Sequence, residues 1–268
     1  MMENNLIYVY CISNHPPDLG KNDEFQGLRC VSSDGFYTVV KMVSESEFSE
    51  ENLKKNLSDL AWLEVQVRNH VRVISLLMED CTVIPFNFSS IYRSEEPLKK
   101  FMSDYADSLI ENLLYVEWKE EWTVKIYSNR KVLIEQIDEL SEEAASLEKQ
   151  IMASSPGRAF LMKRKKADLI ENEVDRLCKV YGQEYFDGFR KLSEAFTLNN
   201  LIPKELSERN DEMILNATFL VSKDRAVDIA SAAMNLKKKN IELGFDIEIT
   251  GPWPPFSFIS IKEKSNAR

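Results

Sequence analysis

The sequence has few of the residues from which catalytic and metal sites are usually built. Its 268 residues include two histidines, four cysteines and eight glycines. Cys11, Cys30, Cys81 and Cys178 form no C-x-x-C pair, so we expect reduced thiols in place of a metal site or a disulfide framework. The glycines form neither G-x-x-x-x-G-K-[ST] nor G-x-G-x-x-G, so a phosphate-binding loop has no support. We therefore predict that the protein uses no metal and no cofactor.

A long apolar run and an excess of positive charge are also missing. No stretch is long enough to span a bilayer, and Met1–Asn5 has neither the basic region nor the apolar region of a secretory signal. The formal net charge is -10. This disfavours nucleic acids, whose phosphates are bound by clustered Lys and Arg, and it disfavours anionic membrane surfaces. We expect a cytoplasmic protein that binds neither nucleic acid nor membrane.

What the sequence does contain is the material for two folded domains. Hydrophobic residues make up 44% and charged residues 29% of the chain, which is ordinary for a globular protein, and its length favours two domains. Ser33-Asp34-Gly35 lies between two strand-like runs and is typical of a hairpin. The first domain is predicted over residues 1–117 as α+β, with elements in the order strand 6–12, strand 27–32, strand 36–43, helix 49–80, strand 82–88 and helix 94–114.

The second domain, predicted over residues 118–268, is expected to be ferredoxin-like with long helices. Strands are predicted at 122–127, 213–221, 245–250 and 256–261, with a helix at 224–243 between the second and third. Apolar residues recur by threes and fours over 133–151 and again over 170–181. This pattern indicates two antiparallel helices joined at Pro156-Gly157, each burying its seam on the other. We therefore expect a mainly antiparallel sheet covered by helices in each domain.

The closing segment, Gly251–Phe258, contains three prolines around one tryptophan. Proline lacks a backbone donor and fixes φ, so this segment is predicted to be neither helix nor a regular interior strand. A tryptophan held between prolines loses little conformational freedom on binding. Trp253 with Pro252, Pro254 and Phe256 is therefore a candidate contact for another protein, although packing on its own sheet or between the two domains explains the pattern equally well.

One histidine and one basic run are the remaining candidates for chemistry. His70 could act as a general base oriented by Glu79 or Asp80, which would make the protein a small-molecule enzyme of α+β type. Asp80 is ten positions away on the same predicted helix, so we favour a packing histidine. The run 163–166 (Lys-Arg-Lys-Lys) spreads around its helix, and either solvation or contact with an acidic protein surface accounts for it.

Seven segments, in order along nearly the whole chain, resemble the gas vesicle accessory proteins of the GvpF/GvpL family. Phe256 stands where tyrosine is frequent in that family. The matching segments are Leu6–Tyr10, Arg68–Ile74, Val83–Phe88, Glu121–Ile126, Gly157–Leu161, Asn216–Val221 and Thr250–Phe258.

The resemblance implies a non-enzymatic accessory or minor structural protein of gas vesicle assembly. Its implied partners are the hydrophobic wall protein of the vesicle and other gas vesicle accessory proteins, in the cytoplasm, with association with the finished vesicle left open. On this reading Arg158 and Phe160 join the four closing-segment residues as protein-interaction candidates. The alternatives are the enzyme centred near His70 and an unrelated scaffold or chaperone-like binding protein.

Overall fold

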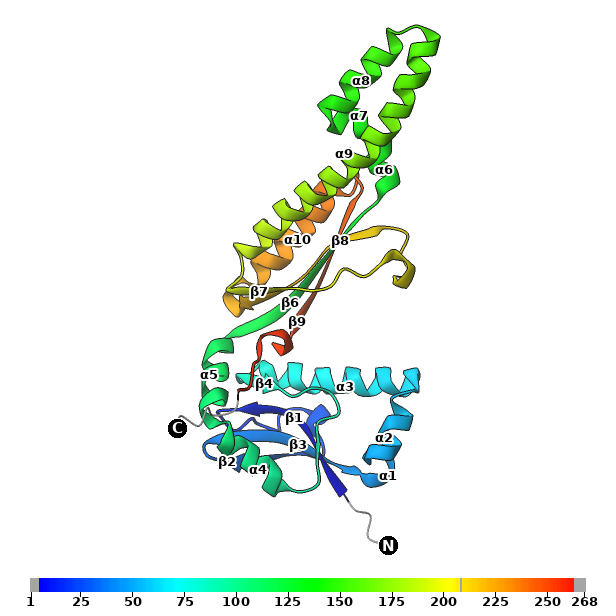
Figure 1. Ribbon diagram of the computed structural model, residues 1–268. Helices are drawn as coiled ribbons and strands as arrows, with labels where there is room; N and C mark the ends of the chain where they lie inside the picture. The colour runs from blue at the N-terminus through cyan, green and yellow to red at the C-terminus, as the bar shows by residue number, and fades with distance from the viewer. Residues whose placement is uncertain (1–4, 208, 263–268) are drawn as a thin grey trace, which may run out of the picture. The chain divides into compact units, whose positions relative to one another are not determined.

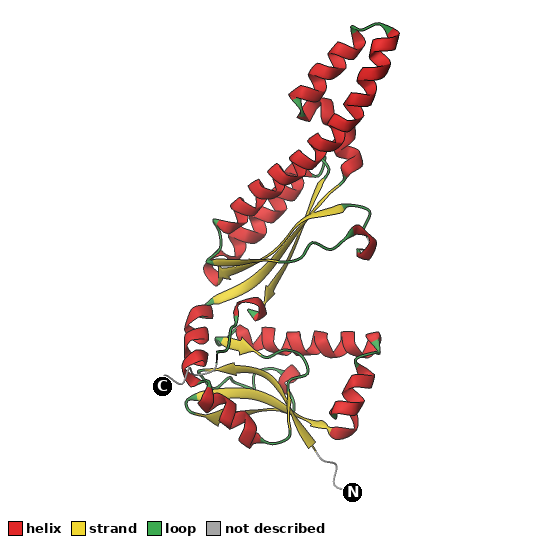
Figure 2. Cartoon of the chain, viewed as in Figure 1, coloured by secondary structure: helices red, strands yellow, loops and turns green. Residues whose placement is uncertain are grey.

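The computed structural model describes residues 5–207 and 209–262, which form two compact units. The first unit contains the chain up to Glu121 together with the chain from Pro252 onward, and the second contains Trp122–Gly251. Each unit combines helices with a sheet (Figure 2). None of the helices in these ranges has the length and apolar composition needed to cross a membrane.

The sheet of the first unit is built around its first strand. Its strands run in the order β2-β3-β1-β4, and β5 also pairs with β1. Asp34 and Gly35 both have positive φ, 52° and 81°, so the predicted hairpin between β2 and β3 is confirmed. The strands are β1 Asn5–Ser13, β2 Leu28–Ser33, β3 Phe36–Ser44, β4 Val83–Pro85 and β5 Ile91–Tyr92.

Helices cover both faces of this sheet. Alternate residues of β1 point to opposite sides, so Tyr8 and Tyr10 pack with α3 while Ile7 and Val9 pack with α4 and α5. This explains why β1 is apolar along its whole length. The helices are α1 Glu45–Phe48, α2 Glu50–Asn56, α3 Leu60–Met78, α4 Glu95–Asp104 and α5 Ala106–Val116.

The prediction of one helix over 49–80 was wrong, because the chain contains two helix starts there. Ser49 accepts a hydrogen bond from the N–H of Asn52 and begins α2. Asp59 accepts from the N–H groups of Ala61 and Trp62 and begins α3. Such side chains satisfy the free donors of a new helix and compete with continuation of the old one.

The sheet of the second unit has the order β7-β8-β6-β9. Numbered along the chain these strands are 2-3-1-4, which confirms the predicted ferredoxin-like arrangement. The elements are β6 Lys119–Ser128, α6 Arg130–Glu135, α7 Ile137–Leu140, α8 Glu142–Met152, α9 Pro156–Arg190, β7 Ala195–Leu198, β8 Glu212–Ser222, α10 Ala226–Asn240 and β9 Phe245–Trp253. The strand β7 was missed, since its four residues do not alternate between apolar and polar.

Helices α9 and α10 lie along one face of this sheet (Figure 1). Phe189 of α9 and Ile229 of α10 pack with Phe219 and Phe245 of the strands in one apolar core. The predicted helical hairpin is confirmed for α8 and α9: α8 ends at Met152 and α9 begins at Pro156, which occupies the first turn of the helix as proline favours. The prediction of one continuous helix over 133–151 was wrong, because this stretch is divided into α6, α7 and α8. The hairpin extends beyond the sheet, where α7 and α8 accompany the first half of α9 (Figure 1).

The closing segment differs from its prediction in three ways. The strand β9 continues through Gly251 and Pro252 to Trp253, which proline permits because β9 is an edge strand. The predicted strand at 256–261 was wrong, since residues 256–258 form a short 3₁₀ helix. The second domain was also predicted to run to residue 268, whereas the described chain from Pro252 onward packs with the first unit.

Candidate functional site

The closing segment is fixed to the first unit by an aromatic contact and by buried polar side chains. The ring of Phe256 lies 6.3 Å from that of His70, and Pro254 is buried. Trp253 keeps 39% of its surface exposed, and Pro252 is exposed beside it. The four candidates predicted here therefore serve packing in part: Trp253 and Pro252 are exposed, Phe256 is half-buried and Pro254 is buried.

Glu121 and Asn112 hold the backbone of this segment. The Glu121 carboxylate accepts hydrogen bonds from the backbone N–H of Ser257 at 2.8 Å and from its hydroxyl at 3.0 Å. Burial raises the pKa of Glu121, and these two bonds oppose that rise. The Asn112 amide accepts from the N–H of Ser260 at 2.9 Å and donates to its carbonyl at 3.0 Å. The segment thus has a specific path along the first unit.

His70 is a packing residue whose two ring nitrogens are both engaged. Its Nε2 lies 2.9 Å from the Phe86 carbonyl and must carry the proton, so Nδ1 accepts the hydroxyl of Tyr8 at 2.8 Å. The ring stacks on Tyr10 with an interplanar angle of 19°. Burial lowers the pKa of His70, so the neutral ring is favoured. Asp80, a predicted orienter, instead binds Lys21 at 2.6 Å.

No catalytic set forms around this histidine in the described chain. The cavity that His70 borders, of about 480 Å³, is lined mainly by polar side chains such as Glu24, Glu47, Gln66 and Asn69. Tyr8, which also lines the cavity, already bonds His70 Nδ1, and Nε2 is bonded to the Phe86 carbonyl. Within residues 5–207 and 209–262, no group of three His, Cys, Asp or Glu side chains could hold a metal ion.

The largest run of exposed apolar side chains in the second unit follows the edge of its sheet. We call residues 195–206, comprising β7 and the chain after it, the edge segment. In the described chain β7 pairs with β8 alone. Leu198 is 61% and Leu206 79% exposed. The other exposed apolar side chains of the edge segment are Phe196, Leu201 and Ile202.

The backbone of the edge segment is also oriented for pairing. The N–H of Asn199 donates to the Asn216 carbonyl of β8 at 2.8 Å. In an antiparallel ladder alternate residues bond to the same neighbour, so Phe196 and Leu198 direct their N–H and C=O groups away from β8. An apolar edge strand with outward-directed backbone groups is suited to accept an additional strand from another chain.

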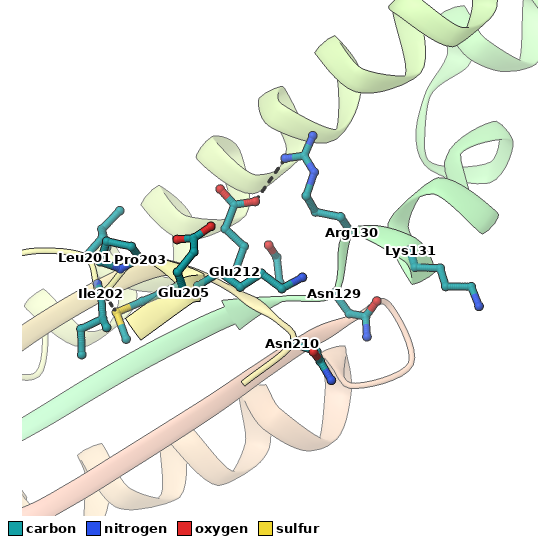
Figure 3. Close-up of a pocket in the computed structure, with 12 residues that line it drawn as sticks. Asn129, Arg130, Lys131, Leu201, Ile202, Pro203, Glu205, Asn210 and Glu212 are labelled. Carbon is teal, nitrogen blue, oxygen red and sulfur yellow. Dashed lines mark hydrogen bonds and ion pairs between the residues drawn. The ribbon is translucent and has the colours of Figure 1, made fainter. Parts of the chain in front are cut away.

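A cavity of about 720 Å³ lies beside the edge segment (Figure 3). Leu201 and Ile202 line it together with Met213, whose sulfur accepts the N–H of Ile202 at 3.4 Å. Arg130 and Lys131, at the start of α6, also line this cavity (Figure 3). This mixture can receive apolar side chains of a peptide, and the described residues that line the cavity include no histidine and no cysteine.

Two arginines near the edge segment each form ion pairs with three carboxylates. Arg130 binds Glu171 at 2.7 Å, Asp175 at 2.6 Å and Glu212 at 3.2 Å, which joins the start of α6 to α9 and β8. Arg209 stacks on the ring of Tyr127 at 4.0 Å and forms ion pairs with three carboxylates. Those carboxylates are Asp211, Asp246 and Glu248. The edge segment is therefore exposed, whereas the chain around Arg130 and around Arg209 is held by ion pairs.

The remaining two predicted residues, Arg158 and Phe160, lie near the end of the helical hairpin. We call the exposed residues Met152, Arg158, Phe160, Leu161, Lys163, Arg164 and Lys165 the hairpin tip. Phe160 is 74% exposed. Within the described chain none of the four cations of the tip forms an ion pair, whereas the next residue, Lys166, binds Asp138 and Glu148 at 2.8 and 2.9 Å.

The six predicted residues thus fall on two surfaces, four on the closing segment of the first unit and two on the hairpin of the second. The edge segment was not predicted as a site at all. Its signal in the sequence is weak: Phe196, Leu198, Leu201, Ile202 and Leu206 occur at irregular spacing with two asparagines and a proline among them. Their exposure becomes evident only when β7 is placed at the edge of the sheet.

Comparison with known proteins agrees with the resemblance seen in the sequence. Residues 6–260 match the family model "Gas vesicle synthesis protein GvpL/GvpF". Gas vesicle protein L from Streptomyces sp. (strain CB03234) is 26% identical over 272 residues, which cover 98% of this chain and 96% of that protein.

Two crystal structures share the fold at 17% identity each. GvpF from Anabaena sp. PCC7120 superposes with a TM-score of 0.67 over 97% of this chain and all of that one. GvpF from Microcystis aeruginosa gives 0.61 over 96% of this chain and all of that one. The family match over nearly the whole length carries the assignment, and the chain belongs to the GvpL/GvpF family of gas vesicle synthesis proteins.

Proposed function

We propose that this gas vesicle protein acts by binding, without catalysis, and that the edge segment receives an apolar strand of the vesicle wall protein. The observation that carries the proposal is the row of exposed apolar side chains on β7, which has one neighbouring strand in the described chain, and on the segment that follows it. The most exposed members are Leu198 of β7 and Leu206 of the short 3₁₀ helix at 204–206. Family membership supports a role in gas vesicle formation.

The physical reason is the behaviour of a hydrophobic shell subunit before it polymerises. Exposed apolar surface costs about 25 cal/mol per Å² in water, so an unassembled subunit tends to aggregate. A partner that adds backbone hydrogen bonds and covers apolar side chains would hold such a subunit in an assembly-competent form. The net charge of -10 would keep the resulting complex soluble.

Trp253 and Pro252 are proposed as a second contact, either for the wall protein or for another accessory protein. Their exposure beside the buried Pro254 supports this, because the ring is held in place before a partner arrives. The protein would work in the cytoplasm, where wall subunits are made, and could remain with the vesicle.

The test is copurification of the wall protein with variants of the edge segment. We expect Leu198→Ser combined with Leu206→Ser to reduce recovery of wall protein by more than about tenfold, as loss of central apolar contacts does. The matched control is Val227→Ser with Met234→Ser, two exposed apolar residues of α10, which should leave recovery unchanged. Circular dichroism establishes that each variant is folded.

Leu198→Pro separates strand addition from simple apolar contact. It removes an N–H that faces away from β8, so pairing of β7 with β8 should survive. If an added strand binds there, recovery of wall protein falls although the apolar area is largely kept. Wild-type recovery by both folded edge variants would overturn the proposal.

A further inference from the structure

We propose that the polar cavity between the sheet and α3 of the first unit binds a small zwitterionic molecule of the α-amino acid class. The proposal does not depend on the edge segment, because every residue that lines this cavity belongs to the first unit. It rests on three groups that border the cavity. They are a lysine without an ion pair, a buried hydroxyl without a hydrogen bond, and a carboxylate that does not pair with the lysine.

Lys41 occupies an uncommon place for a lysine. In the register of the sheet it lies between Tyr8 of β1 and Leu28 of β2, and residues directly opposite one another point to the same side. Tyr8 and Leu28 pack with α3, so Lys41 lies on the side of the sheet that α3 covers. It lines the cavity, it is exposed there, and within the described chain it forms no ion pair. Its ammonium is therefore available to an anionic group of a ligand.

Tyr10 contributes a buried hydroxyl that the described chain does not use. It is the extra residue of β1 where the register shifts between Val9 and Cys11, and such bulges re-aim a side chain. Tyr10 is 8% exposed and lines the cavity, yet its hydroxyl has no hydrogen-bond partner among residues 5–207 and 209–262. Burial raises the pKa of Tyr10 to about 12, so the hydroxyl keeps its proton. Since buried polar groups are nearly always bonded, a ligand oxygen is a fitting acceptor for it.

One side of α3 borders the cavity with further polar groups. Gln66, Asn69, His70 and Val73 line it and recur at three- and four-residue spacing. The amides of Gln66 and Asn69 form no hydrogen bond within the described chain, so they can donate to a ligand and accept from it. His70 is bonded through both nitrogens and is left with no proton to exchange, which favours binding over chemistry.

The carboxylates of the cavity decide the charge of its ligand. Glu24 is paired with Arg72 at 2.7 Å, so its charge is balanced. Glu47 accepts the indole N–H of Trp62 at 2.9 Å and forms no ion pair within the described chain. Lys41 and Glu47 thus border one cavity with opposite charges that do not pair with each other. A ligand that carries both an ammonium and a carboxylate group can bond to both of them.

Size and composition narrow the class further. The cavity has a volume of about 480 Å³, within the range of small-molecule sites. Met42, Val43 and Phe48 add apolar surface to its lining, which suits the carbon side chain of an amino acid. A nucleotide would place several negative charges beside one unpaired cation and two carboxylates. An amino acid has no net charge, so the net charge of -10 does not repel it.

The experiment is a titration of the purified, isotope-labelled full-length chain with each standard L-α-amino acid in turn, followed by two-dimensional NMR. We expect at least one of them to bind with a dissociation constant below about 1 mM and to shift amide signals of β3 and α3. Two derivatives of that amino acid then test the charges, since the N-acetyl form lacks the ammonium group and the amide form lacks the carboxylate. Each derivative should bind about tenfold more weakly or worse.

Three substitutions locate the site. Lys41→Met should weaken binding by about tenfold or more, because it removes a charged donor. Tyr10→Phe should weaken it by about fivefold and leaves every hydrogen bond within the described chain intact. Lys55→Met, at an exposed lysine of α2 that does not line the cavity, is the matched control and should bind as the wild type does. Circular dichroism establishes that each variant is folded.

The absence of binding by any of these amino acids at up to about 10 mM would overturn the proposal and leave the cavity to water. Equal affinity for either derivative would overturn the zwitterionic class, and wild-type affinity in both folded cavity variants would overturn the location. Lys41→Met and Tyr10→Phe should still recover wall protein as the wild type does. Failure of the ligand site is therefore distinguishable from failure of the edge segment.

Discussion

The closing segment and the hairpin tip both place an aromatic residue shortly after a proline, and the structure uses them in opposite ways. Phe256 lies against the buried His70, and its neighbours are bonded to Glu121 and Asn112. Phe160 is 74% exposed. In the closing segment the aromatic residue helps to fix the path of the chain. At the hairpin tip the aromatic side chain remains available to solvent.

The difference shows that stiffness in a sequence does not by itself mark a binding site. The prolines of the closing segment suggested an interaction anchor, yet two of them, Pro254 and Pro255, are buried. Large apolar side chains remain exposed instead on the edge segment and on the hairpin tip. Substitutions can test this contrast directly.

The largest expected effect comes from making the same substitution at both aromatic positions. Phe256→Ala should lower the free energy of unfolding of the first unit by about 2–3 kcal/mol, at or below the lower end of the range for buried aromatic residues because Phe256 is half-buried. Phe160→Ala should change the stability by less than about 0.5 kcal/mol. Urea unfolding followed by circular dichroism measures both. Equal losses at the two positions would contradict the contrast.

Two neighbouring lysines give a finer comparison within the hairpin. Lys166→Met leaves the carboxylates of Asp138 and Glu148 without their shared cation and should destabilise the second unit by about 1–2 kcal/mol. Lys165→Met, one position away and exposed, should cost less than about 0.5 kcal/mol. Hydrogen exchange of α7 and α8 amides reports the local effect. A hairpin that tolerates both changes equally would show that the Lys166 bridge contributes nothing measurable.

The parts of this fold that could be predicted are those set by local sequence. The helical hairpin was predicted because its seam residues, among them Ile151, Val174 and Leu177, recur at helical spacing in adjacent stretches. The β2–β3 hairpin was predicted because Asp34-Gly35 supports the positive φ angles of its turn.

The remaining features depend on contacts between residues far apart in the chain. Glu121 meets Ser257 across 136 positions and Asn112 meets Ser260 across 148, so nothing local indicates that the closing segment packs with the first unit. The strand β7 is short, and it is recognisable as a strand only from its pairing with β8 at the edge of the sheet. The edge segment was hidden from the sequence for this reason. The hairpin tip was not, since Arg158, Phe160 and the basic run 163–166 were candidates from the sequence.

The anchoring of the closing segment should also respond to acid through His70. Burial lowers the pKa of this residue, so the unfolded chain binds a proton more readily than the folded one. Its contribution to stability is present above the unfolded pKa of about 6.5 and is lost as the pH falls below that value through the folded pKa. We expect the first unit to lose stability between about pH 7 and pH 5, and His70→Gln to reduce this slope in urea unfolding. An unchanged slope would assign the acid sensitivity to other groups.

Glu121 should give the smallest effect and the opposite sign. Its pKa is raised by burial in spite of the two bonds from Ser257, so the folded state holds a proton more readily than the unfolded state. Stability from this group is fully present below the unfolded pKa of about 4.3 and is lost as the pH rises through the folded pKa. Glu121→Gln keeps an oxygen that can accept the N–H of Ser257 and removes the buried charge. We therefore expect the variant to be slightly more stable than the wild type at pH 7.5 and no more stable at pH 4, as measured by urea unfolding.

Ser257→Ala at the same two pH values is the complementary measurement, because it removes one donor from the carboxylate and should destabilise the protein mainly at the higher pH. If Glu121→Gln instead weakens the first unit at pH 7.5, the ionised carboxylate itself holds the closing segment, and the contrast with the uncovered hairpin tip becomes one of charge as well as burial.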